Sequence, residues 1–195
     1  FKIEEKLHGP LLTNLSRNLE ELKLEVWCSL PGQDTYLTAR PLSCLEKVLG
    51  QFSKLKTVSC CWPRMRRDML LKFESSSVET LSISGGLKIQ HVNCPSLKTL
   101  RLVLNTGLID FGIARQCRLT LQDLTLTISS VSANSSLYEN ITLLIESLSS
   151  LKKITLIAKC SQDFVIRSTS VEEIDLRRAE NIVLDCICPN LKKNT

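Results

Sequence analysis

The chain has 195 residues, of which 43% are hydrophobic and 23% are charged, and its formal net charge is +5. These values are typical of a soluble globular domain with a substantial core, and no apolar run approaches the ~18 residues that a membrane-spanning helix needs. No signal peptide is visible at the start. Because the first residue is Phe1 and not Met, we expect an excised or processed piece of a longer protein.

A short apolar phrase, L-x-x-L-x-L with Val or Ile replacing Leu in places, recurs along the whole chain. Clear copies begin at Leu19, Val78, Leu97, Leu121, Leu151 and Val171, a weaker copy begins at Leu55, and a broken one begins at Leu191. This phrase is the strand signature of leucine-rich repeats, which stack into a solenoid with one continuous core. The sequence therefore predicts an α/β leucine-rich-repeat solenoid, with a parallel sheet on the concave face, as a single domain over residues 1–195. Such folds usually bind other proteins and rarely catalyse reactions.

The intervals between successive copies vary from 19 to 36 residues, and their patterns differ. The long intervals predict helices, one over 41–52 and one inside 140–147, where Leu143, Leu144 and Leu148 form an apolar stripe. The short intervals predict a second extended segment in each coil, because hydrophobicity alternates with a period of two. These extended segments are residues 87–92, 164–166 and 182–184, and residues 111–115 allow at most a turn or two of helix.

The residues between the leucines of each copy are predicted to face the concave side, because successive side chains of a strand point to opposite faces. Two rows of outward positions result, charged at both ends and small, hydroxyl-rich and partly apolar in the middle. The middle of these rows is a candidate recognition patch made of Arg101, Val103, Thr125, Thr127, Thr155 and Ile157. The alternative is that Thr and Val occur there because they are good strand formers, and both explanations can hold.

The cysteines indicate a reducing compartment and no metal site. They are Cys28, Cys44, Cys60, Cys61, Cys94, Cys117, Cys160, Cys186 and Cys188. The chain contains no C-x-x-C, and its two histidines, His8 and His91, are far apart in sequence, so the spacing expected of a zinc site is missing. Scattered thiols in apolar contexts are typical of small buried hydrophobes, so we expect an intracellular protein of the cytoplasm or nucleus.

Catalytic motifs are missing from the sequence. It contains no G-x-S-x-G, H-E-x-x-H, G-x-G-x-x-G or G-x-x-x-x-G-K-[ST]. Gly85-Gly86 is best explained as a turn, and no histidine lies near Cys61 in sequence to activate it as a nucleophile. The sequence therefore predicts no enzyme, no catalytic residue and no cofactor. Aromatic residues are only 5% of the chain and are not interleaved with basic ones, so a nucleic-acid groove is not expected.

Two phrases, Cys94-Pro-Ser-Leu97-Lys-Thr-Leu100 and Cys188-Pro-Asn-Leu191-Lys-Lys, resemble the C-P-x-L-K-x-L units of F-box leucine-rich-repeat proteins, especially the plant kind. The resemblance covers roughly residues 15–193. It implies the substrate-recognition domain of a ubiquitin-ligase receptor, whose separate F-box would dock the ligase adaptor, although no F-box-like segment appears in this chain. The alternative is the sensor region of an intracellular nucleotide-binding immune receptor, whose irregular repeats also carry C-P-x-L phrases. Both imply a protein or peptide partner, with no nucleic acid and no membrane.

Overall fold

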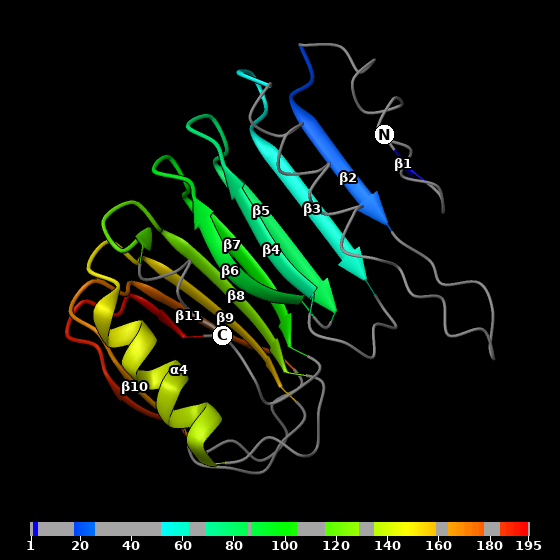
Figure 1. The fold of residues 1–195 in the computed structure, drawn as a ribbon. Coiled ribbons are helices and arrows are strands. Elements are labelled where there is room, and N and C mark those ends of the chain that lie inside the picture. Colours follow the sequence, from blue (N-terminus) through cyan, green and yellow to red (C-terminus); the bar gives the residue numbers. More distant parts are fainter. Residues whose placement is uncertain are drawn as a thin grey trace, which may run out of the picture.

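The computed structural model describes residues 2–3, 18–25, 52–62, 69–85, 87–104, 116–128, 135–158, 164–177 and 184–194. In these ranges the chain forms a parallel β-solenoid (Figure 1). Its main sheet has nine strands in the order β1-β2-β3-β5-β7-β8-β9-β11-β13, and every pairing is parallel. The strands are β1 (Lys2–Ile3), β2 (Glu21–Glu25), β3 (Thr57–Trp62), β5 (Thr80–Gly85), β7 (Thr99–Leu104), β8 (Asp123–Ile128), β9 (Lys153–Ala158), β11 (Glu173–Arg177) and β13 (Lys193–Asn194). The predicted solenoid with a parallel sheet is confirmed.

A second layer covers one face of this sheet (Figure 1). It contains the parallel pairs β4 (Met69–Glu74) with β6 (Leu87–Asn93) and β10 (Phe164–Arg167) with β12 (Leu184–Ile187), together with helix α4 (Ser135–Ser147), which contacts β10. Strands β6 and β10 confirm the extended segments predicted at 87–92 and 164–166. Of the segment predicted at 182–184, only Leu184 lies within the described residues, and it begins β12. Strand β4 was not predicted. The predicted helix at 41–52 lies outside the described residues except for Phe52, and the segment 111–115 lies outside them entirely.

The second predicted helix is confirmed, but one of its apolar residues was misplaced. Helix α4 begins at Ser135, five residues before the predicted start. Its buried stripe is Tyr138, Ile141, Leu144 and Ile145, continued by Leu148 just beyond the helix end. Leu143 was predicted to lie in the apolar stripe, but it is 56% exposed. Because neighbouring residues of a helix are turned by about 100°, Leu143 lies beside the stripe and faces away from the core.

The core is built from columns of side chains that repeat from strand to strand. Each apolar position pairs with its equivalent in the next coil, so that Leu81 lies opposite Leu100, Leu100 opposite Leu124, and Leu124 opposite Ile154. All four of these side chains are buried. The prediction that the leucine-type residues point into the core is therefore confirmed for these strands.

One backbone arrangement locks each coil onto the next. The carbonyl of the residue before a strand accepts the N–H groups of two successive residues in the following coil. The Gln122 carbonyl, for example, accepts from the Lys152 and Lys153 N–H groups at 2.8 and 2.9 Å. The same pair of hydrogen bonds is accepted by the carbonyls of Glu20, Lys56, Glu79, Lys98 and Lys152. Since it recurs at the same place, it fixes the register of the sheet while the return segments differ in length.

We call a carbonyl that accepts these two hydrogen bonds, together with the two donating residues of the next coil, a corner. Short polar side chains stabilise turns that precede the corners. The Ser96 hydroxyl donates to the Ser76 carbonyl at 2.7 Å, and the Ser150 hydroxyl donates to the Leu119 carbonyl at 2.9 Å. Equivalent bonds to the preceding coil are made by the side chains of Ser77, Ser170 and Asn190. Each such turn therefore satisfies backbone carbonyls that the sheet does not use. This row was not predicted, although a Ser, Thr or Asn stands directly before the first apolar residue of most copies and marks it in the sequence.

Candidate functional site: the open face of the sheet

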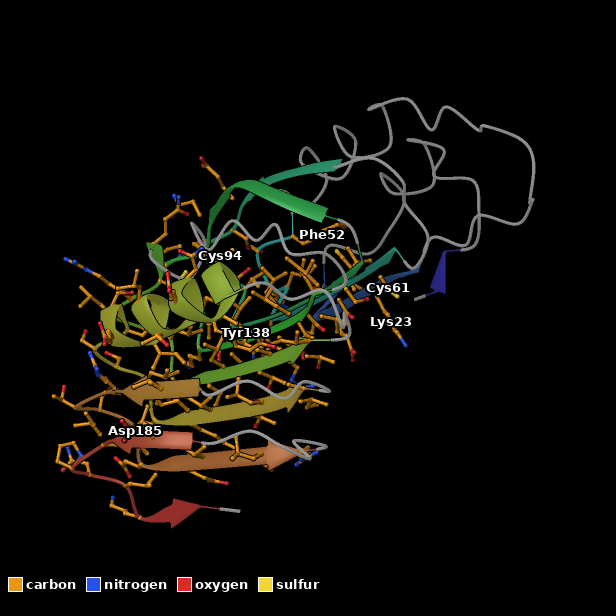
Figure 2. All side chains as sticks on the ribbon, turned by 90° about the horizontal axis from the view of Figure 1, so that it is seen from below. Lys23, Phe52, Cys61, Cys94, Tyr138 and Asp185 are labelled. Carbon is orange, nitrogen blue, oxygen red and sulfur yellow. The ribbon has the colours of Figure 1, made fainter. Side chains whose placement is uncertain are left out.

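Within the described ranges, no element covers one face of the main sheet. We call it the open face: the face of β2, β3, β5, β7, β8, β9 and β11 that is turned away from the second layer. In Figure 2, Lys23 and Cys61 lie on the side of the sheet opposite to α4. Alternation in the strands separates the two sides, as in β8, where Leu124, Leu126 and Ile128 are buried and the residues between them are half-buried. The open face is therefore lined by every second residue of each strand.

The structure brings all six residues of the predicted recognition patch together on this face. Arg101 and Val103 come from β7, Thr125 and Thr127 from β8, and Thr155 and Ile157 from β9. Arg101, Thr125 and Thr155 are in direct register, as are Val103, Thr127 and Ile157. Adjacent strands of a sheet lie about 4.8 Å apart, so the six side chains form one contiguous block of two rows and three strands. We call it the β7–β9 block.

Exposure varies within the β7–β9 block. The Arg101 side chain is exposed, Val103, Thr125, Thr127 and Ile157 are half-buried, and Thr155 is only 7% exposed. A half-buried Val and Ile at the surface of a rigid sheet leave apolar area that a partner can cover. Thr155 contributes mainly to the packing of the sheet, so it is the least accessible of the six predicted residues.

Next to the block, the open face is uncharged. Strands β3 and β5 place Thr57, Ser59 and Cys61 beside Thr80, Ser82 and Ser84, position by position. The two outward rows predicted from the sequence are accompanied by a third, which was not predicted. In it, Thr57, Thr80 and Thr99 continue into Asp123 and Lys153. The signal for it was present, because alternation with a period of two extends one residue upstream of the second apolar residue in each copy.

On the other side of the block, the charges of the open face are paired with one another. Lys153 Nζ lies 2.7 Å from Glu173 Oε1, and Arg177 Nη2 lies 2.7 Å from Asp175 Oδ2. The hydrogen bond to Glu173, together with the attraction of nearby carboxylates that include Asp123, raises the pKa of Lys153 above its ordinary value. Within the described ranges, Arg101 forms no such ion pair.

A second set of ion pairs runs along the corners of the coils. Lys98 Nζ lies 2.8 Å from Glu79 Oε2, and Lys192 Nζ lies 2.6 Å from Glu172 Oε2. These hydrogen bonds to lysine lower the pKa of both glutamates below their ordinary value of 4.5. A carboxylate with a lowered pKa stabilises the fold above its unfolded-state pKa, and the contribution is lost as the pH falls through the folded-state pKa.

Replacing both Glu79 and Glu172 by Gln is therefore expected to flatten the dependence of stability on pH. In the unmodified chain, the urea midpoint should fall as the pH decreases from about 6 to about 3, and the double variant should show a smaller fall over the same range. Glu139→Gln, at an exposed position of α4, is the matched control and should retain the full slope. Equal slopes for the double variant and the control would contradict the stabilising role of the corner ion pairs.

Three of the six cysteines that the structure describes, Cys60, Cys94 and Cys117, are part of the core. Burial raises the pKa of Cys60 and of Cys94 to about 12, and it also raises the pKa of Cys117. Cys186 and Cys188 are half-buried on β12 and just after it, and burial with a hydrogen bond to Cys186 raises the pKa of Cys188 to about 12. The expectation that cysteines serve as small buried hydrophobes is confirmed for Cys60, Cys94 and Cys117.

Among the described residues, no group of three or more His, Cys, Asp and Glu side chains is placed to hold a metal ion. In the same part of the chain, no helix has the length and apolar character needed to cross a membrane.

Comparisons with protein-family models, curated proteins and solved structures gave no significant match. The function has to be inferred from the residues of the open face themselves. Their arrangement is a fixed array of hydroxyl, apolar and charged groups on a sheet whose strands β7, β8 and β9 are hydrogen-bonded on both sides.

Proposed function

We propose that this chain is a non-catalytic scaffold of the leucine-rich-repeat type, which binds a protein or peptide through its open face. The observation that carries the proposal is the β7–β9 block, six side chains from three coils that the register holds in one array. Because the backbone edges of these three strands are already paired, a partner can be recognised only through their side chains.

The physical character of the block fits reversible recognition of a polypeptide. Val103 and Ile157 offer half-buried apolar area, and the threonines between them can donate and accept hydrogen bonds. A rigid sheet loses little conformational entropy when it binds, which makes such a surface efficient. A parallel sheet presents these groups at regular intervals, as solenoid proteins do on the surfaces they use for binding.

Two finer statements belong to this proposal. The coils are leucine-rich repeats, with the open face as the concave face, because the recurring phrase coincides with the strands and their corners. The chain is the substrate-recognition domain of an F-box ubiquitin-ligase receptor, and the C-P-x-L turns that begin at Cys94 and Cys188 support this proposal. The same turns also fit the sensor region of a nucleotide-binding immune receptor. Capture of the cullin ligase adaptor by the full-length protein, or failure to capture it, distinguishes the two.

The scaffold proposal is tested by placing charges in the β7–β9 block. The double variant Thr125→Glu with Ile157→Glu is expected to bind captured partner proteins about tenfold or more weakly, because it puts carboxylates where apolar and hydroxyl contacts form. Binding is measured by quantitative capture from a eukaryotic cell extract, with urea unfolding to verify that each variant is folded. Leu143→Glu is the control, since Leu143 is exposed on α4 in the second layer. If the double variant retained all captured partners, the binding site would not be the open face.

A further inference from the structure

Arg101 occupies the centre of the open face. It lies on β7, which is the fifth strand in the order of the nine-stranded sheet, and its side chain is exposed. The other described cations nearby on this face, Lys153 and Arg177, are engaged with Glu173 and Asp175. Arg101 has no ion-pair partner among the residues that the structure describes. It is thus a positive charge at the middle of the sheet that these carboxylates do not neutralise.

The direct neighbours of Arg101 across the sheet are hydroxyl groups. Ser82 on β5 lies in register on one side, and Thr125 on β8 lies in register on the other. The carboxylate of Asp123 is one diagonal step away, where it accepts a hydrogen bond from Thr99 Oγ1 at 3.5 Å and contributes to the raised pKa of Lys153. The in-register neighbours of Arg101 therefore supply hydroxyl groups, and among the described residues no ion pair joins a carboxylate to it.

This combination favours an anion as the group that binds over Arg101. A guanidinium presents five N–H donors in a planar fork that matches a carboxylate, and each neighbouring hydroxyl can donate one more hydrogen bond. An arginine–carboxylate pair in open water contributes little. The pair becomes selective when a partner covers it, and the apolar strip of Val103, Thr127 and Ile157 lies one step further along the same strands.

We infer that the open face binds an extended acidic peptide segment, with one Asp or Glu carboxylate over Arg101, between Ser82 and Thr125, and an apolar side chain over Val103, Thr127 and Ile157. The inference rests on the proposed function in taking the open face as the interaction surface. Two side chains on one face of a strand are two residues and about 6.7 Å apart, so the acidic and apolar residues of the segment are two positions apart.

The test is a selection of random twelve-residue displayed peptides on the immobilised chain, run in parallel on the Arg101→Glu variant. The unmodified chain should enrich peptides with Asp or Glu within two residues of Leu, Ile, Val or Phe. Arg101→Glu should enrich Lys or Arg at that place, because it reverses the charge at the centre of the face. Arg118→Glu, which makes the same change at an exposed corner residue, should enrich the same acidic peptides as the unmodified chain.

The best enriched peptide is then labelled and its dissociation constant is measured by fluorescence polarisation. Its binding should weaken about tenfold or more when its acidic residue is changed to Gln or when Arg101 is changed to Glu. A version with phosphoserine at the acidic position determines which anion the site prefers. Tighter binding of that version would overturn the choice of a carboxylate in favour of a phosphorylated segment.

The outcomes separate this inference from the proposed function. If Ile157→Glu abolished peptide binding while Arg101→Glu left the acidic preference unchanged, only the role of Arg101 would be wrong. If neither change affected the peptide, the open face would not be the binding surface and both proposals would fail. If no peptide were enriched, the extended-segment partner would be wrong, whereas capture of folded proteins would still test the scaffold.

Discussion

Replacing Leu100 by Ala is expected to destabilise the protein by about 2–5 kcal/mol, because the substitution leaves a cavity in a column that cannot collapse without moving several coils. Leu100 has no exposed surface and lies between the buried side chains of Leu81 and Leu124. Leu124→Ala should have an effect in the same range, because Leu124 is 1% exposed in the next coil.

The free energy of unfolding in urea measures this effect. Leu119→Ala removes the same atoms from a side chain that is 68% exposed, and it should change stability by less than about 0.5 kcal/mol. A loss below about 0.5 kcal/mol for Leu100→Ala as well would mean that the inward positions of the repeat have been assigned to the wrong residues.

Replacing Gln122 by Pro is expected to cost about 3 kcal/mol or more, although the Gln122 side chain itself is exposed. The Gln122 N–H donates to the Lys98 carbonyl at 2.8 Å. A proline ring would remove this donor and place a carbon atom where the hydrogen lies, so the coils that meet at this corner would be forced apart. The free energy of unfolding should therefore fall sharply.

Two controls isolate the backbone as the cause. Gln122→Ala retains the N–H group and should change stability by less than about 0.5 kcal/mol. Thr169→Pro places a proline at the position that Pro95 and Pro189 occupy in their own turns, so it should change stability by less than about 1 kcal/mol. Equal losses from the two prolines would refute the role of the corner bond and indicate a general intolerance of proline in the coils.

Alternating hydrophobicity allowed the main strands to be predicted, and a departure from it explains the missed strand. Strand β4 contains the adjacent apolar residues Leu70 and Leu71, and its register with β6 shifts between Leu71 and Lys72. The residue skipped at this shift is Gln90 of β6, so in β4 it is the adjacent apolar pair Leu70-Leu71 that interrupts the period of two, and the pattern no longer indicates a strand. For α4, the helical period was recognised from Leu143, Leu144 and Leu148. The prediction did not include Tyr138 and Ile141, which begin the buried stripe, and it therefore missed the first turn of the helix.

The six residues of the patch could be chosen from the sequence because each copy of the phrase carries its own outward positions. Their register could also be anticipated once the copies were aligned, despite intervals of 19 to 36 residues. The pairing of charges could not be predicted. Lys153 has more than one acidic neighbour across the strands, and only the side-chain positions show that it bonds to Glu173. The same three-dimensional information shows that Arg101 forms no ion pair with the residues that the structure describes.

The corner bonds make the molecule extensible by whole coils. Each corner requires only a carbonyl of one coil and two N–H groups of the next coil. It forms whether the return segment between them contains a helix or a strand. A duplicated coil such as residues 151–170 would therefore lengthen the sheet by one strand, about 4.8 Å, without turning the face of its neighbours. Sheets of different length, and therefore binding surfaces of different length, can thus be produced by changing the number of coils while each corner stays the same.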